Sequence, residues 1–339
     1  MYKYSLTPAL LGAIANIERL YGQLEALRIP KELQLNLERD NMIQSSFVSN
    51  SIEGNPLSLP EVSNLLLGDR VPANRSEKEV RNYFEILKRL KTRFTGPFLL
   101  SHVLSLHRDL MAGVDDEIAG KIRDSRVVVG SRKFVGGKME VIVKHEPPYH
   151  DAESIKKALV DLIDWFNEEK ETLAVIKTAI FHHQYVYIHP FADGNGRTVR
   201  LLTALLLIRA GYAVNKYFVL DDYYDVDRPA YSDALHSADS GDSTAWVEYF
   251  TSGIKYSLQS ALAKAQNALL TMRVEQRPSK REQQVLGLFA GRGELTSAEI
   301  AEILGVSRQQ AQNLLAALVR KGLIKKIGRT KKSYYRIEN

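Results

Sequence analysis

Apolar residues recur at intervals of three and four along most of the chain, and this spacing predicts a mainly α-helical protein. Helices are expected at residues 8–27, 31–47, 76–91, 98–111, 151–167, 172–188 and 243–274. Ser76 is the expected N-cap of the third of these helices, because Glu79 follows it at the capping-box position. A turn-rich patch at residues 49–56 and a breaker at residues 95–97 are expected to interrupt the helices.

Two runs of β-branched residues break the helical pattern in the middle of the chain. They cover residues 126–130 and 139–143 and flank a glycine turn at Gly136 and Gly137. Paired runs of this kind around a glycine pair predict a β-hairpin.

The pattern changes again after Pro278. Helices are expected at residues 280–289, 298–304 and 308–321, followed by strands at 323–327 and 333–337 around a basic turn. Three helices and a basic hairpin predict a winged helix-turn-helix. Residues 277–339 hold thirteen Lys/Arg and five Asp/Glu, a net charge of 13 − 5 = +8, whereas the whole chain carries only +6 and the remainder therefore 6 − 8 = −2.

Two interpretations of this basic module stay open. In the first, the third helix contacts bases in a major groove and the wing contacts phosphates. The residues concerned are Arg308, Gln309, Gln310, Gln312 and Asn313 on the helix and Lys325, Lys326, Arg329, Lys331 and Lys332 on the wing. In the second, the module docks a protein and its basic face is merely solvated.

The composition narrows the classes of protein that fit. A length of 339 residues predicts two or three domains, and the absence of cysteine excludes disulfides and thiolate zinc sites. No apolar stretch is long enough to span a bilayer, and the N-terminus lacks the apolar segment of a signal peptide. A cytoplasmic protein without a membrane partner is expected, and a homodimer stays open.

The segment from His189 to Arg200 reads HPFADGNGRTVR and precedes an apolar run that ends before Gly211. Such a run predicts a buried helix, with the glycine-rich turn at its N-terminus. Free N–H groups and the positive end of the helix dipole attract phosphate there. Gly194 and Gly196 let the backbone approach an anion closely.

The polar residues of the segment supply the chemistry of a transfer from a nucleotide. His189 precedes a proline, so its ring can project from a rigid loop and take a proton from a hydroxyl. Asp193 is a hard oxygen ligand suited to Mg²⁺. Asn195 can donate to phosphate oxygens, while Arg197 and Arg200 share a helix face and can point at one polyphosphate.

At every specified position the segment resembles the motif of the Fic family, His-x-Phe-x-Asp/Glu-Gly-Asn-Gly-Arg-x-x-Arg. The resemblance covers about residues 98–250 and implies a helical bundle with a β-hairpin flap that transfers AMP from ATP to a Ser, Thr or Tyr hydroxyl of a protein. It implies that His189 is the base, Asp193 the Mg²⁺ ligand and Arg200 the γ-phosphate contact. The implied anion-binding nest consists of Gly194, Asn195, Gly196 and Arg197.

The resemblance assigns two further regions. The flap, with Val127, Val128, Val129 and Gly130 on its first side, would align a target segment by adding a strand. An adenine pocket is implied near Tyr231, Leu235 and Asp239, although several family members carry Asn where Asp239 stands.

A second motif lies earlier in the chain. Ser49, Glu53 and Gly54 fit the family's inhibitory pattern Ser/Thr-x-x-x-Glu-Gly/Asn. A carboxylate against Arg200 would neutralise the cation meant for the γ-phosphate and would misalign ATP for in-line attack. The position of the motif resembles the class in which an inhibitory helix precedes the Fic domain.

The sequence thus predicts an N-terminal helical region with the inhibitory motif at residues 1–95, a Fic domain at 96–275 and a winged helix at 277–339. The function expected is autoinhibited transfer of AMP from Mg²⁺-ATP to a protein hydroxyl, including one on the protein itself. Two alternatives stay open: a DNA-binding regulator whose Fic domain senses nucleotide, and an enzyme that transfers UMP, phosphocholine or phosphate.

Overall fold

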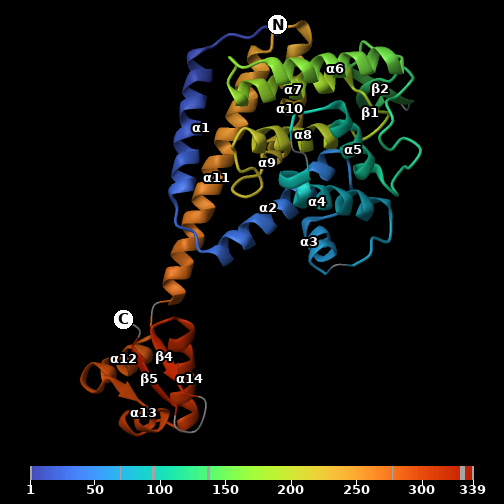
Figure 1. The fold of residues 1–339 in the computed structure, drawn as a ribbon. Helices are drawn as coiled ribbons and strands as arrows, with labels where there is room; N and C mark the ends of the chain where they lie inside the picture. The colour runs from blue at the N-terminus through green and yellow to red at the C-terminus, as the bar shows by residue number, and fades with distance from the viewer. Residues whose placement is uncertain are drawn as a thin grey trace. The chain divides into compact units, whose positions relative to one another are not determined.

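The chain forms two compact units, Met1–Lys264 and Ala265–Asn339. The computed structural model describes residues 2–68, 70–93, 96–135, 138–276, 278–328 and 333–337. The first unit is a helical bundle with one β-hairpin, and the second is a small helical domain with a three-stranded sheet (Figure 1). The predicted fold class, a mainly α protein with a hairpin and a C-terminal winged helix, is confirmed.

The bundle is built around a buried helix. Its helices are α1 Pro8–Ala26, α2 Lys31–Ile52, α3 Leu59–Leu67, α4 Arg75–Arg93, α5 Leu100–Met111, α6 Ala152–Glu168, α7 Ala174–Ile188, α8 Asn195–Arg209, α9 Asp221–Val226, α10 Arg228–Ser237, the 3₁₀ turn η1 Ala238–Ser240 and α11 Thr244–Gln276. Helix α8 contacts α2, α4, α5 and α7 and lies in the interior (Figure 1). After its first two turns it is mostly apolar and is buried on all sides as far as Leu207, as expected of a central helix.

The expected turn at residues 49–56 is wrong in its first part, because α2 continues to Ile52. The polar side chains that suggested a turn find partners in the helical conformation. Ser46 and Asn50 bond to carbonyls four residues earlier in the helix, and Ser49 accepts a hydrogen bond from Arg200. Only at Gly54, with φ +85°, does the chain leave the helix.

The expected start of the next helix is also wrong. Helix α4 begins at Arg75, and the side chain of Asn74, not that of Ser76, accepts the N–H of Glu77. Glu79 therefore makes no capping box, and its carboxylate is available for the contacts described below. Helix α3, which the hydrophobic pattern did not predict, begins with a capping box between Ser58 and Glu61.

The β-hairpin exists, but it is longer and lies later than expected. Strand β1 spans Val129–Val135 and pairs antiparallel with β2, Lys138–His145, with a register irregularity after Val129. Val127 and Val128 precede the strand, so they are not part of the pairing. The predicted glycine turn at Gly136 and Gly137 lies outside the described residues.

The C-terminal unit has the predicted three helices and hairpin. It contains α12 Lys280–Arg292, α13 Ser297–Leu304 and α14 Arg308–Arg320, with the strands β3 Glu294–Leu295, β4 Ile324–Ile327 and β5 Tyr334–Ile337 in the order β3-β5-β4. The side chains of Ser279, Thr296 and Ser307 cap the three helices. Of the predicted wing residues, Arg329, Lys331 and Lys332 lie outside the described residues.

Candidate functional site

The loop between α7 and α8 is held in a fixed conformation by its own polar groups. His189 ends α7 with φ +51°, a left-handed conformation that is uncommon outside glycine. Gly194, at φ +76°, precedes α8. The Asn195 amide accepts from the Phe191 N–H at 3.0 Å and donates to the Phe191 carbonyl at 2.7 Å. Asn195 thus bonds the loop itself, instead of facing outward as its predicted phosphate contact would require.

The loop is also held by His107, which the sequence did not identify as a site residue. The Gly120 N–H donates to Nδ1 of His107, so Nε2 carries the proton and donates to the Asp193 carbonyl at 3.0 Å. The His107 ring also stacks on Phe191 at 3.6 Å between centroids. His107 lies in α5, far from the motif in sequence, so no local signal could have assigned it this role.

The environment of His189 favours a neutral imidazole. Burial lowers its pKa to about 4, and the positive charge of Arg123 acts in the same direction. The Arg123 guanidinium donates to the His189 carbonyl at 2.6 Å and fixes the backbone of this residue. A neutral ring at neutral pH keeps a lone pair free to accept a proton, as the predicted base requires.

Arg200 is the most completely enclosed charge of the site. Its Nε donates to the Ser49 hydroxyl at 2.7 Å, and its Nη2 donates to the Ser49 carbonyl at 2.7 Å and to Glu53 Oε1 at 2.8 Å. Burial by itself lowers the pKa of Arg200, but Glu53 and the weaker contributions of Tyr231, Asp221 and Tyr83 together outweigh burial and raise it. The structure therefore brings together the residues of the two motifs, 147 positions apart in the chain.

Glu53 fills the space above the helix N-terminus. A side chain at Gly196 would collide with Glu53 Oε1, so the glycine leaves room for a carboxylate pressed against the backbone. Such a position, beside a buried arginine and the first turn of α8, is one where an anion is stabilised. The Arg228 guanidinium, through Ser51, holds the end of α2 that carries Glu53.

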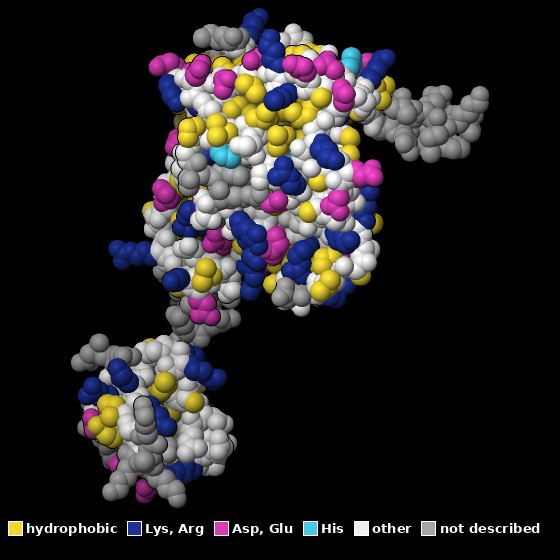
Figure 2. All heavy atoms as spheres, turned by 45° about the vertical axis from the view of Figure 1, so that its right-hand side comes forward, with side chains coloured by type: hydrophobic (Ala, Val, Ile, Leu, Met, Phe, Trp, Pro, Cys, Tyr) yellow, Lys and Arg dark blue, Asp and Glu magenta, His cyan; other side chains and the backbone are white. Residues whose placement is uncertain are grey.

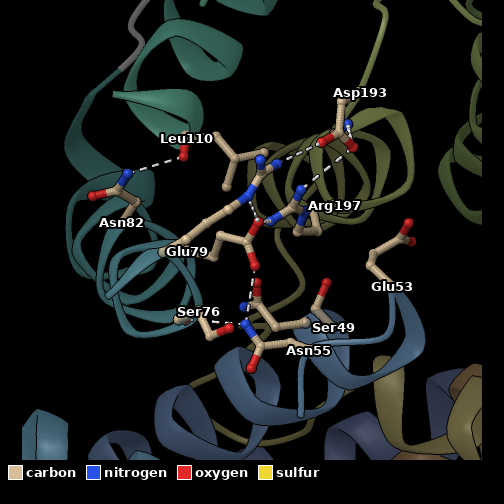
Figure 3. Close-up of polar contacts among 12 residues, drawn as sticks. Ser49, Glu53, Asn55, Ser76, Glu79, Asn82, Leu110, Asp193 and Arg197 are labelled. Carbon is tan, nitrogen blue, oxygen red and sulfur yellow. Dashed lines mark hydrogen bonds and ion pairs between the residues drawn. The ribbon is translucent and has the colours of Figure 1, made fainter. Parts of the chain in front are cut away.

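A second group of contacts joins α4 to the motif (Figure 3). Arg75 donates to Asp193 Oδ2 at 3.1 Å, and Glu79 Oε1 lies 3.3 Å from Nη1 of Arg197. The other Glu79 oxygen accepts from the Asn55 amide at 3.0 Å, which ties α4 to the end of α2. Arg75 and Glu79 of α4 thus engage the predicted metal ligand Asp193 and the predicted nest residue Arg197 from within the protein. Neither contact has a sequence signal, because α4 and α8 are remote in the chain.

The structure does not present Tyr231 and Asp239 as open ligand contacts. Tyr231 is buried, stacks on Tyr224 at 4.3 Å and bonds through its hydroxyl to His182 at 3.0 Å. Asp239 is engaged by three histidines. Their predicted contacts with adenine stay predictions. On the flap, Val128 and Val143 are about half exposed, and among the described residues no third strand pairs with β1 or β2.

Two family models match separate parts of the chain. Residues 97–207 match the model of the Fic/DOC family, and residues 280–331 match that of the MarR family. The chain is 32% identical over 222 residues to protein adenylyltransferase fic-1 of Caenorhabditis briggsae, covering 62% of this chain and 39% of that protein. It is 30% identical over 243 residues to protein adenylyltransferase Fic of Culex quinquefasciatus, covering 68% and 44%. The chain therefore spans less than half the length of these relatives.

A solved structure matches the whole length of the chain. It is a Fic family protein from Desulfovibrio desulfuricans G20, with a TM-score of 0.66 and 27% identity, covering 100% of this chain and 98% of that one. No helix among the described residues is long and apolar enough to cross a membrane. The motif at the start of α8, the family matches and the shared fold lead to one conclusion: this chain carries a Fic domain, followed at its C-terminus by a MarR-type winged helix.

Proposed function

We propose that the chain is a protein adenylyltransferase that holds itself inactive through Glu53. Its substrates are ATP and a protein that bears a Ser, Thr or Tyr hydroxyl. The observation that carries the proposal is the 2.8 Å contact between Glu53 and Arg200 over Gly196. Relatives named adenylyltransferases support the reaction class.

The position of the Glu53 carboxylate indicates where a phosphate of ATP would bind. Its carboxylate is an anion seated between a buried arginine and a glycine backbone at a helix N-terminus, the environment that a phosphate prefers. Arg197 also keeps its Nε buried and without a hydrogen-bond partner in the described part of the chain. These donors support a site for polyphosphate once Glu53 withdraws.

The proposed reaction uses His189 as general base. The oxygen of the target hydroxyl bonds to the α-phosphorus of ATP, the bond from that phosphorus to the oxygen bridging to the β-phosphate breaks, and pyrophosphate leaves. Neutral His189 takes the hydroxyl proton. The free edge of the hairpin, near Val128 and Val143, would hold the target segment as an added strand.

Asp193 is the residue that would hold Mg²⁺. Its side chain is about half exposed, and a bound Mg²⁺ would neutralise phosphate charge during transfer. Arg75 donates to the same carboxylate, so metal binding requires this arginine to release Oδ2. The contact between Arg75 and Asp193 would therefore inhibit transfer in addition to Glu53.

Intact mass spectrometry tests the reaction. The Glu53→Gly protein is incubated with Mg²⁺ and with ATP, UTP or CDP-choline in separate reactions, and His189→Ala in the same background is the control. An added AMP mass with ATP alone supports adenylyl transfer. An added UMP, phosphocholine or phosphate mass would assign a different donor, and no adduct on the protein or on lysate proteins would overturn the proposal.

The match to the MarR family supports a second proposal for the C-terminal unit: DNA binding through α14 and the wing. Arg308, Lys325 and Lys326 are exposed on these elements. Figure 2 shows Lys and Arg side chains at several separate places on the described part of this unit. A nucleotide-responsive DNA-binding regulator would use both units of the chain.

A further inference from the structure

Three histidines from different elements converge on Asp239. Nδ1 of His145, at the end of β2, lies 3.0 Å from Oδ2 of Asp239, and Nδ1 of His236 in α10 lies 3.1 Å from the same oxygen. Nε2 of His183 in α7 lies 2.9 Å from the other oxygen, Oδ1. The cluster connects the base of the hairpin to the helical bundle.

The partners of His145 fix where its proton lies. Its Nε2 faces the Tyr187 carbonyl at 3.0 Å, and a carbonyl can only accept, so Nε2 carries the proton. In the neutral ring, Nδ1 then presents a lone pair to a carboxylate oxygen that is also an acceptor. Two acceptors cannot hydrogen-bond to each other. A cation between them resolves the conflict, and it is either a second proton on the ring or a metal ion.

His183 has a different role, because its hydrogen bonds are complete. The Gln184 amide donates to Nδ1 of His183, which leaves the proton on Nε2 for Asp239 Oδ1. This bond orients the carboxylate so that Oδ2 faces the two Nδ1 atoms of His145 and His236. In many metal sites the ligands are themselves hydrogen-bonded. A carboxylate ligand takes part in a further hydrogen bond, and an imidazole ligand donates its other N–H to a carbonyl.

We propose that His145 Nδ1, His236 Nδ1 and Asp239 Oδ2 bind one divalent transition-metal ion, with Zn²⁺ as the best match. The three atoms all lie within 4.8 Å of one another. Tetrahedral Zn²⁺ holds such ligands at about 2.0–2.1 Å, which separates them by roughly 3.3 Å. Imidazole nitrogen and carboxylate oxygen are common zinc ligands, and the chain has no cysteine to compete for the metal.

Two of the three proposed ligands are partly exposed, so an ion can reach the site from solvent. The side chain of His145 is 4% exposed, while those of His236 and Asp239 are 17% and 25% exposed. Three protein ligands leave a fourth position for water or another group from solvent. The bound ion joins the last residue of β2 to α10 and η1, so it fastens the base of the hairpin to the bundle.

The test is zinc binding by the full chain without an affinity tag. The protein is stripped with EDTA, titrated with ZnCl₂ by calorimetry, and its metal content is measured after dialysis. One tight equivalent per chain is expected. His236→Ala and Asp239→Asn are expected to weaken it at least tenfold, while His150→Ala, an exposed histidine outside the cluster, leaves it unchanged. Asp193→Asn also leaves it unchanged, which separates this site from the proposed Mg²⁺ site.

Two further measurements keep the proposal falsifiable if a variant does not fold. His183→Ala removes an orienting bond and not a ligand, so Zn²⁺ affinity is expected to fall about 10- to 100-fold. X-ray absorption of the wild-type zinc complex is expected to show nitrogen or oxygen neighbours at about 2.0–2.1 Å with imidazole outer-shell scattering. Absence of a stoichiometric ion, or equal binding in His236→Ala, would overturn the proposal and assign the cluster to protonated histidines.

Discussion

Oε1 of Glu53 lies 2.8 Å from Nη2 of Arg200, and this contact pairs the carboxylate of the inhibitory motif with the last arginine of the Fic motif. The Arg200 side chain is 1% exposed and that of Glu53 is 33% exposed, so the carboxylate is the partner that can leave. A buried arginine without a counter-charge is costly. In the proposed function, the phosphates of ATP replace Glu53 as the counter-charge of Arg200. Glu53 and ATP therefore compete for the same cation.

His189 is expected to be needed for transfer and dispensable for nucleotide binding. His189→Ala in the Glu53→Gly background should lower the rate by about 10²–10⁴-fold, the usual contribution of a general base. The dissociation constant for ATP should stay within a few-fold, because the anion-binding groups come from α8 and Arg200. Labelling with [α-³²P]ATP and calorimetry measure the two quantities. Transfer that survives the change would show that His189 is not the base.

Arg75 is expected to weaken metal binding at Asp193. Arg75→Ala in the Glu53→Gly background should lower the Mg²⁺ concentration for half-maximal rate by up to about fivefold, since an exposed ion pair contributes at most about 1 kcal/mol. Arg89→Ala, which removes an exposed ion pair on the same helix, is the control. An unchanged Mg²⁺ dependence in Arg75→Ala would mean that this arginine does not compete with the metal.

Acid is expected to destabilise the protein through its buried histidines. Burial lowers the pKa of His107 to about 4, whereas the unfolded chain titrates near 6.5. Between these values the unfolded state binds the proton and the folded state does not, so stability is fully present above pH 6.5 and falls as the pH drops towards 4. At about 1.4 kcal/mol per pKa unit, His107 alone accounts for a change on the order of 3 kcal/mol.

The pH effect can be assigned to His107 by substitution. His107→Gln should flatten the dependence of the free energy of unfolding on pH between 6.5 and 4, while His150→Gln, at an exposed position, should leave it as in the wild type. Burial also lowers the pKa of His182 and of His189, so part of the dependence should persist in His107→Gln. Urea unfolding at a series of pH values measures it, and equal slopes in wild type and His107→Gln would exclude the assignment.

DNA binding by the winged helix is expected to depend on salt. If Arg308 and Lys326 contact phosphates, replacing either with Ala should weaken binding and reduce the slope of log K against log salt by about one. Arg39→Ala, an exposed arginine in the first unit, should change neither quantity. An affinity that does not vary with salt would favour the interpretation that the module docks a protein.

Short-range signals in the sequence predicted the local structure well. The three helices of the C-terminal unit, and the apolar run of α8 behind its glycine turn, each depend on neighbouring residues alone. The turn expected at Ser49 is wrong partly because the Ser49 hydroxyl bonds to Arg200, far away in the chain. Sequence spacing carries no information about that kind of partner.

The same limit applies to the site. The motif residues and Glu53 could be listed from the sequence, because they lie in recognisable patterns. His107 beneath the loop, Arg75 on Asp193 and Glu79 against Arg197 come from helices that reach the motif only in the folded chain. The histidines around Asp239 likewise come from a strand and two helices that no periodicity relates.

The rate of AMP transfer by Glu53→Gly compared with the wild type shows whether Glu53 inhibits the protein. Both proteins are incubated with [α-³²P]ATP and Mg²⁺, and incorporation into protein is followed over time, with Glu18→Gly as a matched control on α1. Inhibition by Glu53 predicts strong labelling by Glu53→Gly and weak labelling by the wild type and Glu18→Gly. Equal rates in all three proteins would contradict inhibition by Glu53.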